Sequence, residues 1–285
     1  MERALAEAVG RALGTSVRHA QAVAGGDIHR AFHVTLGDGR EAFVKTSEGA
    51  PRGMFAAEAE GLRWLAAPGA IAVPEVLAVL EAPPALVLAW ITPGRTESPE
   101  ALGRGLAALH RASPAAFGLA AGNWLATLPQ DNRPSERWSA FYAERRLVPL
   151  LARAVDRGAA SPRMQRGIAW VVAHVDELVG SEEAPARLHG DLWSGNVVWG
   201  EGGRPWLVDP AAYGGHREID LAMMRLFGGF SARTFDAYAE AFPLAAGHEE
   251  RLPLYQLLPL LAHCALFGGS YVSGVEAALA RLGAA

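Results

Sequence analysis

One segment of the sequence, residues 188–210 (LHGDLWSGNVVWGEGGRPWLVDP), concentrates side chains that could do chemistry. Asn196 follows Asp191 after five positions, and Asp209 follows Asn196 after thirteen. Carboxylate and amide oxygens are ligands that Mg²⁺ accepts while it keeps several of its waters. A further carboxylate beside an attacking hydroxyl can orient that hydroxyl and accept its proton. Together these are the requirements of phosphoryl transfer from a nucleotide.

The same spacing occurs in protein kinases, where Asn follows the catalytic Asp by five positions and a metal-binding Asp comes later. We therefore interpret Asp191 as the catalytic base and Asn196 with Asp209 as magnesium ligands. The alternative is an accidental match in which each Asp merely caps a helix or begins a turn. An H-G-D-x-x-x-x-N pattern arises by chance roughly two times in a thousand in a chain of this length, at about 5% usage per residue type. An accidental match would also leave the spacing of thirteen positions between Asn196 and Asp209 unexplained.

Two short apolar runs predict the element that positions the metal ligands. Residues 197–199 and 206–208 read as a hairpin that carries Asn196 and Asp209 at its two ends. His189, next to the base, is interpreted as a buried imidazole bonded to backbone that supports the loop.

The run HREID, residues 216–220, has two interpretations that the sequence leaves open. It is either a charged helix start or a source of a buried carboxylate, Asp220, that braces the catalytic loop.

The N-terminal third predicts helix, strand, strand, helix, strand, strand. A Gly-containing turn separates the first two strands, and Pro68-Gly69 ends the second helix. After the first helix, the predicted segments are Ala31–Leu36, Glu41–Thr46, Met54–Ala67, Val76–Leu80 and Leu86–Ile91. Helical periodicity dominates beyond the breaker at residues 92–94. We expect an α+β fold with an N-terminal antiparallel sheet lobe, residues 1–92, and a larger helical lobe, residues 93–285.

Lys45 is the candidate cation for nucleotide phosphates. A lone lysine in a strand is usually a solvated edge residue, but the next predicted helix offers Glu58, and a Lys–Glu pair holds the phosphates in kinases. Upstream, Gly25 and Gly26 could expose backbone amides to an anion. The alternative for this glycine pair is a plain turn.

Charge and cysteine content narrow the function classes. A net charge of −4 argues against nucleic acid as the main partner. The single cysteine, Cys264, excludes an internal disulfide and a cysteine-only metal site and suits a reducing cytoplasm. The N-terminus does not read as an export signal. The apolar stretch Leu252–Gly268 is broken by prolines and polar residues, so we expect a buried helix pair and no membrane span.

Motifs along nearly the whole chain resemble the fructosamine kinase (ketosamine 3-kinase) family, which is related to the aminoglycoside phosphotransferases. They are GGDIHRAFHV, FVK, EAEGLRWL, LAALHR, PQDN, WSAFYAERRL, HGDLWSGNV, VDPAAYGGHREIDLAM, LFGGF and LYQLLPLLAH. HGDLWSGN and GHREIDLAM are the most specific of these. The resemblance implies a two-lobed, protein-kinase-like fold that uses ATP and Mg²⁺ and binds a small sugar–amine adduct, a ketoamine.

The resemblance also implies a role for each matching residue. Asp191 would take the proton of the sugar 3-hydroxyl, and the resulting ketoamine 3-phosphate would decompose and free the amine, which is deglycation. The implied nucleotide and metal residues are Gly25, Gly26, Lys45, Glu58, the backbone around Trp90, Asn196 and Asp209. Trp193 and the region from Asn123 to Asn132 are the implied sugar contacts.

The chain departs from the family pattern at three positions. Gly214 stands where a second Tyr is expected, and Gly122 and Ala126 stand where the family tends to have an acid and a Gly. An aminoglycoside or another small alcohol is therefore retained as an alternative acceptor, with a nucleotide-binding pseudokinase as the alternative outside the enzymes. The ketoamine sugar and the oligomeric state are left open.

Overall fold

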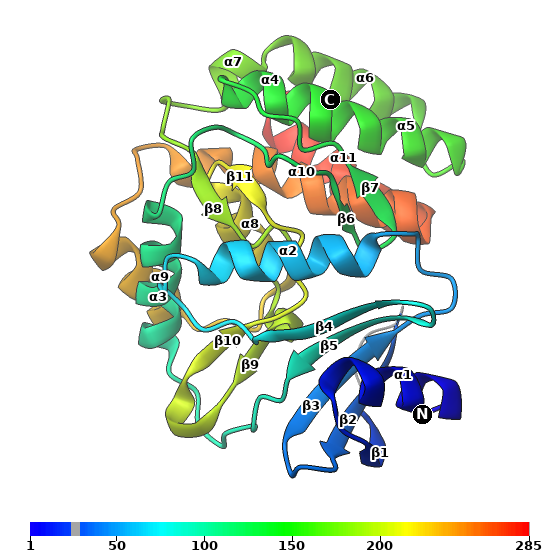
Figure 1. The fold of residues 1–285 in the computed structure, drawn as a ribbon. Coiled ribbons are helices and arrows are strands. Elements are labelled where there is room, and N and C mark those ends of the chain that lie inside the picture. The colour runs from blue at the N-terminus through cyan, green and yellow to red at the C-terminus, as the bar shows by residue number, and fades with distance from the viewer. Residues whose placement is uncertain (24–28, 285) are drawn as a thin grey trace.

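The computed structural model describes residues 1–23 and 29–284 and contains an N-terminal antiparallel sheet and a helical C-terminal region (Figure 1). The sheet has five strands in the order β1-β2-β3-β5-β4. Their bounds are β1 (Val17–Val23), β2 (Arg30–Leu36), β3 (Glu41–Thr46), β4 (Val76–Glu81) and β5 (Pro84–Ala89). The predicted β2–β3 hairpin is confirmed, and β5 begins and ends two residues earlier than predicted.

Alternation of side chains places one face of this sheet in a core. Phe32, Val34 and Leu36 of β2 are buried together with Val44 of β3. Helix α1 (Arg3–Leu13) covers them through Leu5 and Val9 (Figure 1). Successive residues of a strand face opposite sides, so this register leaves Lys45 on the other face, toward helix α2.

Helix α2 (Met54–Ala66) lies between the sheet and the C-terminal region (Figure 1). Its Phe55, Ala59 and Leu62 pack on Leu86 and Leu88 of β5. At Gly61 the helix comes close to the segment that follows Asp209, since a Cβ there would lie 3.4 Å from the Ala212 methyl. This packing fixes α2 between the two halves of the site.

The C-terminal region is a set of helices with short strand pairs between them. Its helices are α3 (Pro99–Arg111), α4 (Trp138–Tyr142), the π-helical turn η1 (Ala143–Leu147), α5 (Val148–Asp156), α6 (Pro162–Ala173), α7 (Val175–Leu178), α8 (Glu218–Phe227), α9 (Ala232–Ala241), α10 (His248–Phe267) and α11 (Val272–Arg281). Its strands are β6 (Asn123–Leu125) with β7 (Leu128–Gln130), β8 (Ala186–Leu188) with β11 (Tyr213–Gly215), and β9 (Val197–Trp199) with β10 (Pro205–Leu207). Single 3-10 turns are η2 (Ser194–Asn196), η3 (Glu201–Gly203) and η4 (Gly269–Tyr271).

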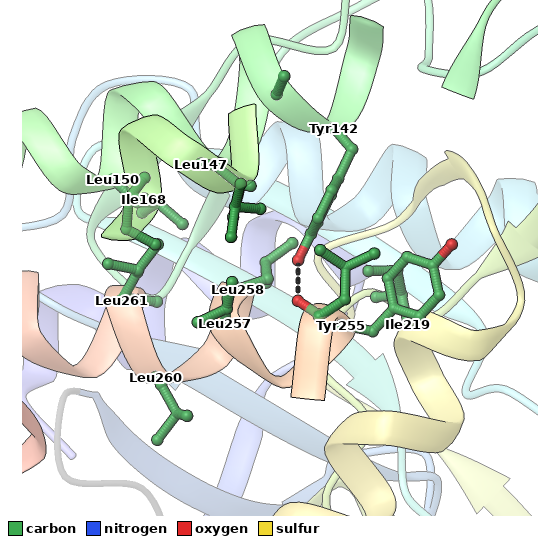
Figure 2. Packing of buried hydrophobic residues seen from close by; sticks show 14 of the residues in the cluster. Tyr142, Leu147, Leu150, Ile168, Ile219, Tyr255, Leu257, Leu258, Leu260 and Leu261 are labelled. Carbon is green, nitrogen blue, oxygen red and sulfur yellow. Dashed lines mark hydrogen bonds between the residues drawn. The ribbon is translucent and has the colours of Figure 1, made fainter. Parts of the chain in front are cut away.

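The main core of this region forms around α10. Figure 2 shows Leu257, Leu258 and Leu261 of α10 beside Leu147 and Ile168 from the neighbouring helices. The Tyr142 hydroxyl donates to the Leu254 carbonyl at 2.6 Å, which ties α4 to α10 in this core.

Two expectations from the sequence were wrong. Strand β1 was not predicted because it is a half-exposed edge strand whose polar residues do not alternate with apolar ones. The predicted C-terminal helix pair is one helix, α10, which continues through Pro253 and Pro259. Burial of its leucines outweighs the cost of the missing proline N–H groups. The lobe boundary after residue 92 stays a prediction.

Among residues 1–23 and 29–284, no helix combines the length and the apolar character that crossing a membrane requires.

Candidate active site

The loop between β8 and η2 holds Asp191 against Asn196. Asn196 Nδ2 donates to the Asp191 carbonyl at 2.8 Å and to Asp191 Oδ2 at 3.3 Å. Because the amide nitrogen is engaged in this way, Asn196 Oδ1 is the atom left to face a cation. Asn196 is buried, and Asp191 is half-buried.

The β9–β10 hairpin joins the two predicted metal ligands, as the sequence indicated. Leu207 pairs with Val197, and the Val208 amide donates to the Asn196 carbonyl at 3.1 Å. Asp209 then turns out of the strand with φ of 53°, a left-handed conformation that few residues other than Gly adopt and that Asp tolerates. The oxygens of Asn196 and Asp209 suit Mg²⁺, which commonly takes one or two protein oxygens and completes its octahedron with water and phosphates. The donor set therefore fits the metal.

Lys45 lies at the centre of the site's charges. Its Nζ is 3.0 Å from both carboxylate oxygens of Glu58 and 3.1 Å from Asp209 Oδ1. Burial favours the neutral amine, but the charges of Glu58 and Asp209 outweigh it and raise the pKa of Lys45 above its ordinary value. Burial opposes ionisation of Asp209 as well, yet the Lys45 cation holds the pKa of Asp209 below its usual range. Lys45 is therefore a fixed cation beside a fixed anion at neutral pH.

The carboxyl group of Asp191 has the opposite character. Burial raises the pKa of Asp191 to about 7, and the nearby charge of Asp209 adds to this effect. A carboxylate whose pKa lies near neutrality is a stronger base than an ordinary Asp and still exists partly in its basic form. The surroundings therefore raise the pKa of Asp191 and lower the pKa of Asp209. These opposite shifts would suit Asp191 to act as a base and Asp209 to bind a cation.

Asp220 braces the catalytic loop from behind. Its Oδ2 accepts from the His189 amide at 2.8 Å, and its Oδ1 accepts from the Gly190 amide at 2.9 Å. His110 Nε2 lies 3.2 Å from Asp220 Oδ2, and its Nδ1 lies 2.8 Å from the Tyr238 hydroxyl. The role of His110 was missed, because a His on the apolar face of a predicted helix gives no sign of its partner.

His189 has a structural position. Its Nε2 donates to the Val208 carbonyl at 2.8 Å, and its Nδ1 accepts from the Asp191 amide at 3.3 Å. Burial lowers the pKa of His189, so the ring stays neutral, and both nitrogens are occupied by backbone groups. The ring holds the loop in place and has no free nitrogen for proton transfer.

Of the two tryptophans named from the sequence, Trp90 is half-buried and Trp193 is exposed. Trp90 follows β5 and stacks on His33 with ring centroids 3.7 Å apart. Trp193 is 43% exposed and lies over Gly195, where a Cβ would collide with the indole ring. Gly25 and Gly26 lie outside the described residues.

The two asparagines implied as sugar contacts are buried and bonded to the protein. Asn132 Nδ2 donates to Asn123 Oδ1 at 2.9 Å, and Asn123 Nδ2 donates to the Ala212 carbonyl at 2.8 Å. Arg146 Nη2 donates to Asn132 Oδ1 at 2.5 Å. These contacts connect the β6–β7 hairpin to the segment after Asp209, and a direct contact of either amide with substrate stays a prediction.

The fold accounts for Gly214, whereas at position 126 it favours the Gly of the family pattern over the Ala of this chain. Ala126, at the β6–β7 turn, has φ of 53°, the conformation in which Gly is unstrained. Gly214 pairs with Gly118, and a Cβ at Gly214 would lie 2.5 Å from the Ala116 carbonyl. A tyrosine at position 214 would therefore require this backbone to move.

The sheet, the helical region and the Lys45–Asp191–Asp209 arrangement define a protein-kinase-like phosphotransferase. Solved structures of low identity share this fold, such as a thermostable mutant of the aminoglycoside phosphotransferase APH(4)-Ia, with a TM-score of 0.63 at 18% identity over 99% of each chain. The fructosamine kinase family model matches residues 1–284, and the chain belongs to that family.

Individual relatives agree with this assignment. A protein of Thermus thermophilus with the name "Probable ketoamine kinase" is 42% identical over 255 residues, 90% of each chain. One of the same name from Escherichia coli K12 is 38% identical and covers 92% of this chain and 91% of its own. The crystal structure of a candidate fructosamine-3-kinase from Thermobifida fusca superposes with a TM-score of 0.92 at 39% identity over all of both chains. The protein is accordingly an enzyme of the ketoamine kinase type.

Proposed function

We propose that this enzyme transfers the γ-phosphoryl group of ATP to the 3-hydroxyl of a ketoamine, with Asp191 as the base. The observation that carries the proposal is the convergence of Asp191, Asn196, Asp209 and Lys45 from three segments of the chain, with the pKa of Asp191 raised to about 7. Sequence identity to proteins with ketoamine kinase names supports the acceptor class.

Each residue has a distinct part in the proposed reaction. Magnesium, when bound, neutralises charge on the phosphate oxygens, and Asn196 Oδ1 with the Asp209 carboxylate would hold it. Lys45 binds phosphate oxygens and is oriented by Glu58. One carboxylate oxygen of Asp191 would accept a hydrogen bond from the sugar hydroxyl, hold it in line and take its proton.

The residues that would contact the ketoamine and the adenine are proposed from their exposure and their chemistry. Trp193 follows Asp191 by two positions and presents an exposed indole, a surface on which a sugar ring can pack. Backbone groups near Trp90, at the end of β5, would meet the adenine. A 3-phosphorylated ketoamine decomposes to release its amine, so the proposed physiological result is deglycation of a small amine, an amino acid or a protein lysine.

The test is ADP release with Mg²⁺ and ATP on ribulosamine, fructosamine and an aminoglycoside offered side by side. We expect turnover on a ketoamine, and Asp191→Asn should abolish most of it, by about 10²–10⁴-fold, while still binding ATP. Asp236→Asn, an exposed change on α9, is the matched control and should behave as wild type. Turnover on the aminoglycoside alone would keep the mechanism and refute the ketoamine acceptor, and full activity of Asp191→Asn would refute the base.

A further inference from the structure

A cavity lies between the β6–β7 hairpin and α5, at the π-helical turn η1. Its volume is about 280 Å³, and its lining includes none of Lys45, Glu58, Asp191, Asn196 and Asp209, although residues 129–131 belong to the segment implied in sugar binding. It is lined by Pro129, Gln130, Asp131, Arg145, Arg146, Pro149, Leu150 and Arg153. The lining thus contains three guanidinium groups and one carboxylate.

The one carboxylate, Asp131, is already paired with Arg133, which lies outside the lining, and with Arg145, which lies in it. Arg133 binds Asp131 through both oxygens, and Arg145 Nη1 lies 2.9 Å from Asp131 Oδ2. Hydrogen bonds from Arg133 hold the pKa of Asp131 well below its usual range. Arg153 forms no side-chain hydrogen bond or ion pair within the part of the chain that the structure describes. The cavity therefore keeps an excess of positive charge.

Arg146 is a buried cation whose direct partners are all neutral. It is 1% exposed, and its guanidinium carbon lies 4.6 Å from the centroid of the Phe141 ring and 4.1 Å from that of the Tyr213 ring. Its Nη1 donates to the Asp131 carbonyl at 2.9 Å, and its Nη2 donates to the Asn132 side chain. Burying a charge without an opposite charge in contact is costly, so the site favours an anion.

Three polar atoms of the lining are buried without a partner. They are Arg146 Nε, Arg145 Nε and Gln130 Oε1, within the described residues. Two of the three are N–H donors on cations. Unsatisfied buried donors are uncommon in folded proteins and mark places where a ligand or water supplies the acceptor.

The backbone brings these groups together in an unusual way. Consecutive residues of an α-helix point about 100° apart, yet Arg145 and Arg146 both contact Asp131, one through its carboxylate and the other through its carbonyl. They lie in the π-helical turn Ala143–Leu147, a geometry that recurs at functional sites. Arg153 is seven residues beyond Arg146, two helical turns along the same face.

We propose that this cavity is a binding site for a small oxyanion, a phosphate or carboxylate group, held by the guanidinium groups of Arg145, Arg146 and Arg153. Guanidinium groups match both anions through paired N–H donors. The volume is at the lower end of ligand pockets, so it suits a free anion or the charged end of a small metabolite. The lining contains none of the proposed nucleotide-binding residues, and hydrogen bonds through Asn132 and Asn123 connect Arg146 to Ala212.

The test is calorimetric titration of the full-length protein with inorganic phosphate and, separately, with succinate, at constant ionic strength. To exclude phosphate bound at the nucleotide site, the titration is repeated with Lys45→Met. We expect binding in the wild type and in Lys45→Met, and a loss of about tenfold or more in affinity in Arg153→Gln. Arg166→Gln, an exposed residue of α6 outside the cavity, is the control with the same change of charge.

The titrations distinguish a phosphate site, a carboxylate site and binding at the nucleotide site. Binding of phosphate but not succinate assigns a phosphate site, and binding of succinate assigns a carboxylate site. Arg145→Gln provides a second cavity variant if Arg153→Gln folds poorly by circular dichroism. Phosphate binding that Lys45→Met loses and Arg153→Gln keeps would overturn the proposal, because the anion would then occupy the nucleotide site. Absence of heat with both anions, or equal loss in Arg166→Gln, would overturn it as well.

Discussion

Lys45 Nζ and Asp209 Oδ1 lie 3.1 Å apart, although one residue belongs to the N-terminal sheet and the other follows the β9–β10 hairpin. Glu58 contacts the same ammonium at 3.0 Å. Asp209 is 42% exposed in its side chain, whereas those of Lys45 and Glu58 are 10% and 11% exposed. The Lys45–Glu58 ion pair is therefore buried, and the Asp209 carboxylate beside it is accessible at the site.

Replacing Lys45 by Met should impair the enzyme more than it impairs the fold of the C-terminal region. The change removes the phosphate-binding cation and leaves Glu58 and Asp209 without the charge between them. We expect kcat/KM for ATP to fall about a hundredfold or more, as for loss of an electrostatic group at a reacting phosphate. Coupled ADP release measures this. Lys45→Arg keeps the charge and should retain more activity, and equal activity of both variants would contradict a role for the cation.

Activity should rise with pH through about 7. The basic form of Asp191 is the carboxylate, and burial raises the pKa of Asp191 to about 7. Below that pH the carboxyl is protonated and cannot accept the hydroxyl proton. The measurement is kcat/KM against pH with the ketoamine that turns over best. An acidic limb near pH 4, the ordinary value for Asp, would show that the surroundings do not perturb the group.

The same pKa shift predicts an effect on stability. The folded-state pKa of Asp191 lies above its unfolded value, so the folded protein holds the proton more tightly. The free energy of unfolding therefore falls as the pH rises from about 4 to about 7. Asp191→Asn removes this pH-dependent loss of stability. The melting temperature of the variant minus that of the wild type should therefore be larger at pH about 8 than at pH about 5. A difference that does not change with pH would contradict the shift.

Asp220→Asn should weaken both the fold and catalysis. Asp220 is fully buried and accepts from the His189 and Gly190 amides. An amide at this position turns an NH₂ group toward an N–H donor, so one of these bonds is lost. We expect a loss of about 1–3 kcal/mol in the free energy of unfolding, measured in urea, and a lower kcat. Asp236→Asn, which is exposed, should change stability by less than about 0.5 kcal/mol.

Gly195→Ala tests the exposed indole of Trp193. The added methyl group would collide with that ring and must displace it, although the backbone of Gly195 is not in the left-handed region. We expect KM for the ketoamine to rise while KM for ATP stays near the wild-type value. Gly49→Ala, where a Cβ meets open space, is the control. An unchanged KM for the ketoamine in Gly195→Ala would remove Trp193 from the acceptor site.

Local sequence patterns predicted much of the secondary structure around the site, because these elements form between residues that are close together in the sequence. The hairpin between Asn196 and Asp209 is visible as two apolar runs, and the periodicity of residues 54–67 places Glu58 on a helix that can reach Lys45. The α+β class and the antiparallel N-terminal sheet followed from the same patterns.

The remaining features depend on distant packing, which local patterns do not encode. The sequence left Asp220 open between two interpretations, because its partners at residues 189 and 190 are fixed by the docking of α8. His110 gave no signal for the same reason. Strand β1 pairs with the edge of β2, and α10 continues through two prolines because its leucines are buried.

The support of the catalytic loop by Asp220 and His110 also bears on when the enzyme becomes active during its synthesis. Asp220 follows the amides that it binds by about thirty residues, and His110 reaches Tyr238 across 128 positions. The ribosome therefore releases the loop before α8 and α9 exist, and contacts of such long range form late in folding. A nascent chain that ends before residue 220 lacks the carboxylate that holds the loop of its own base, so we expect a copy of that length to be inactive.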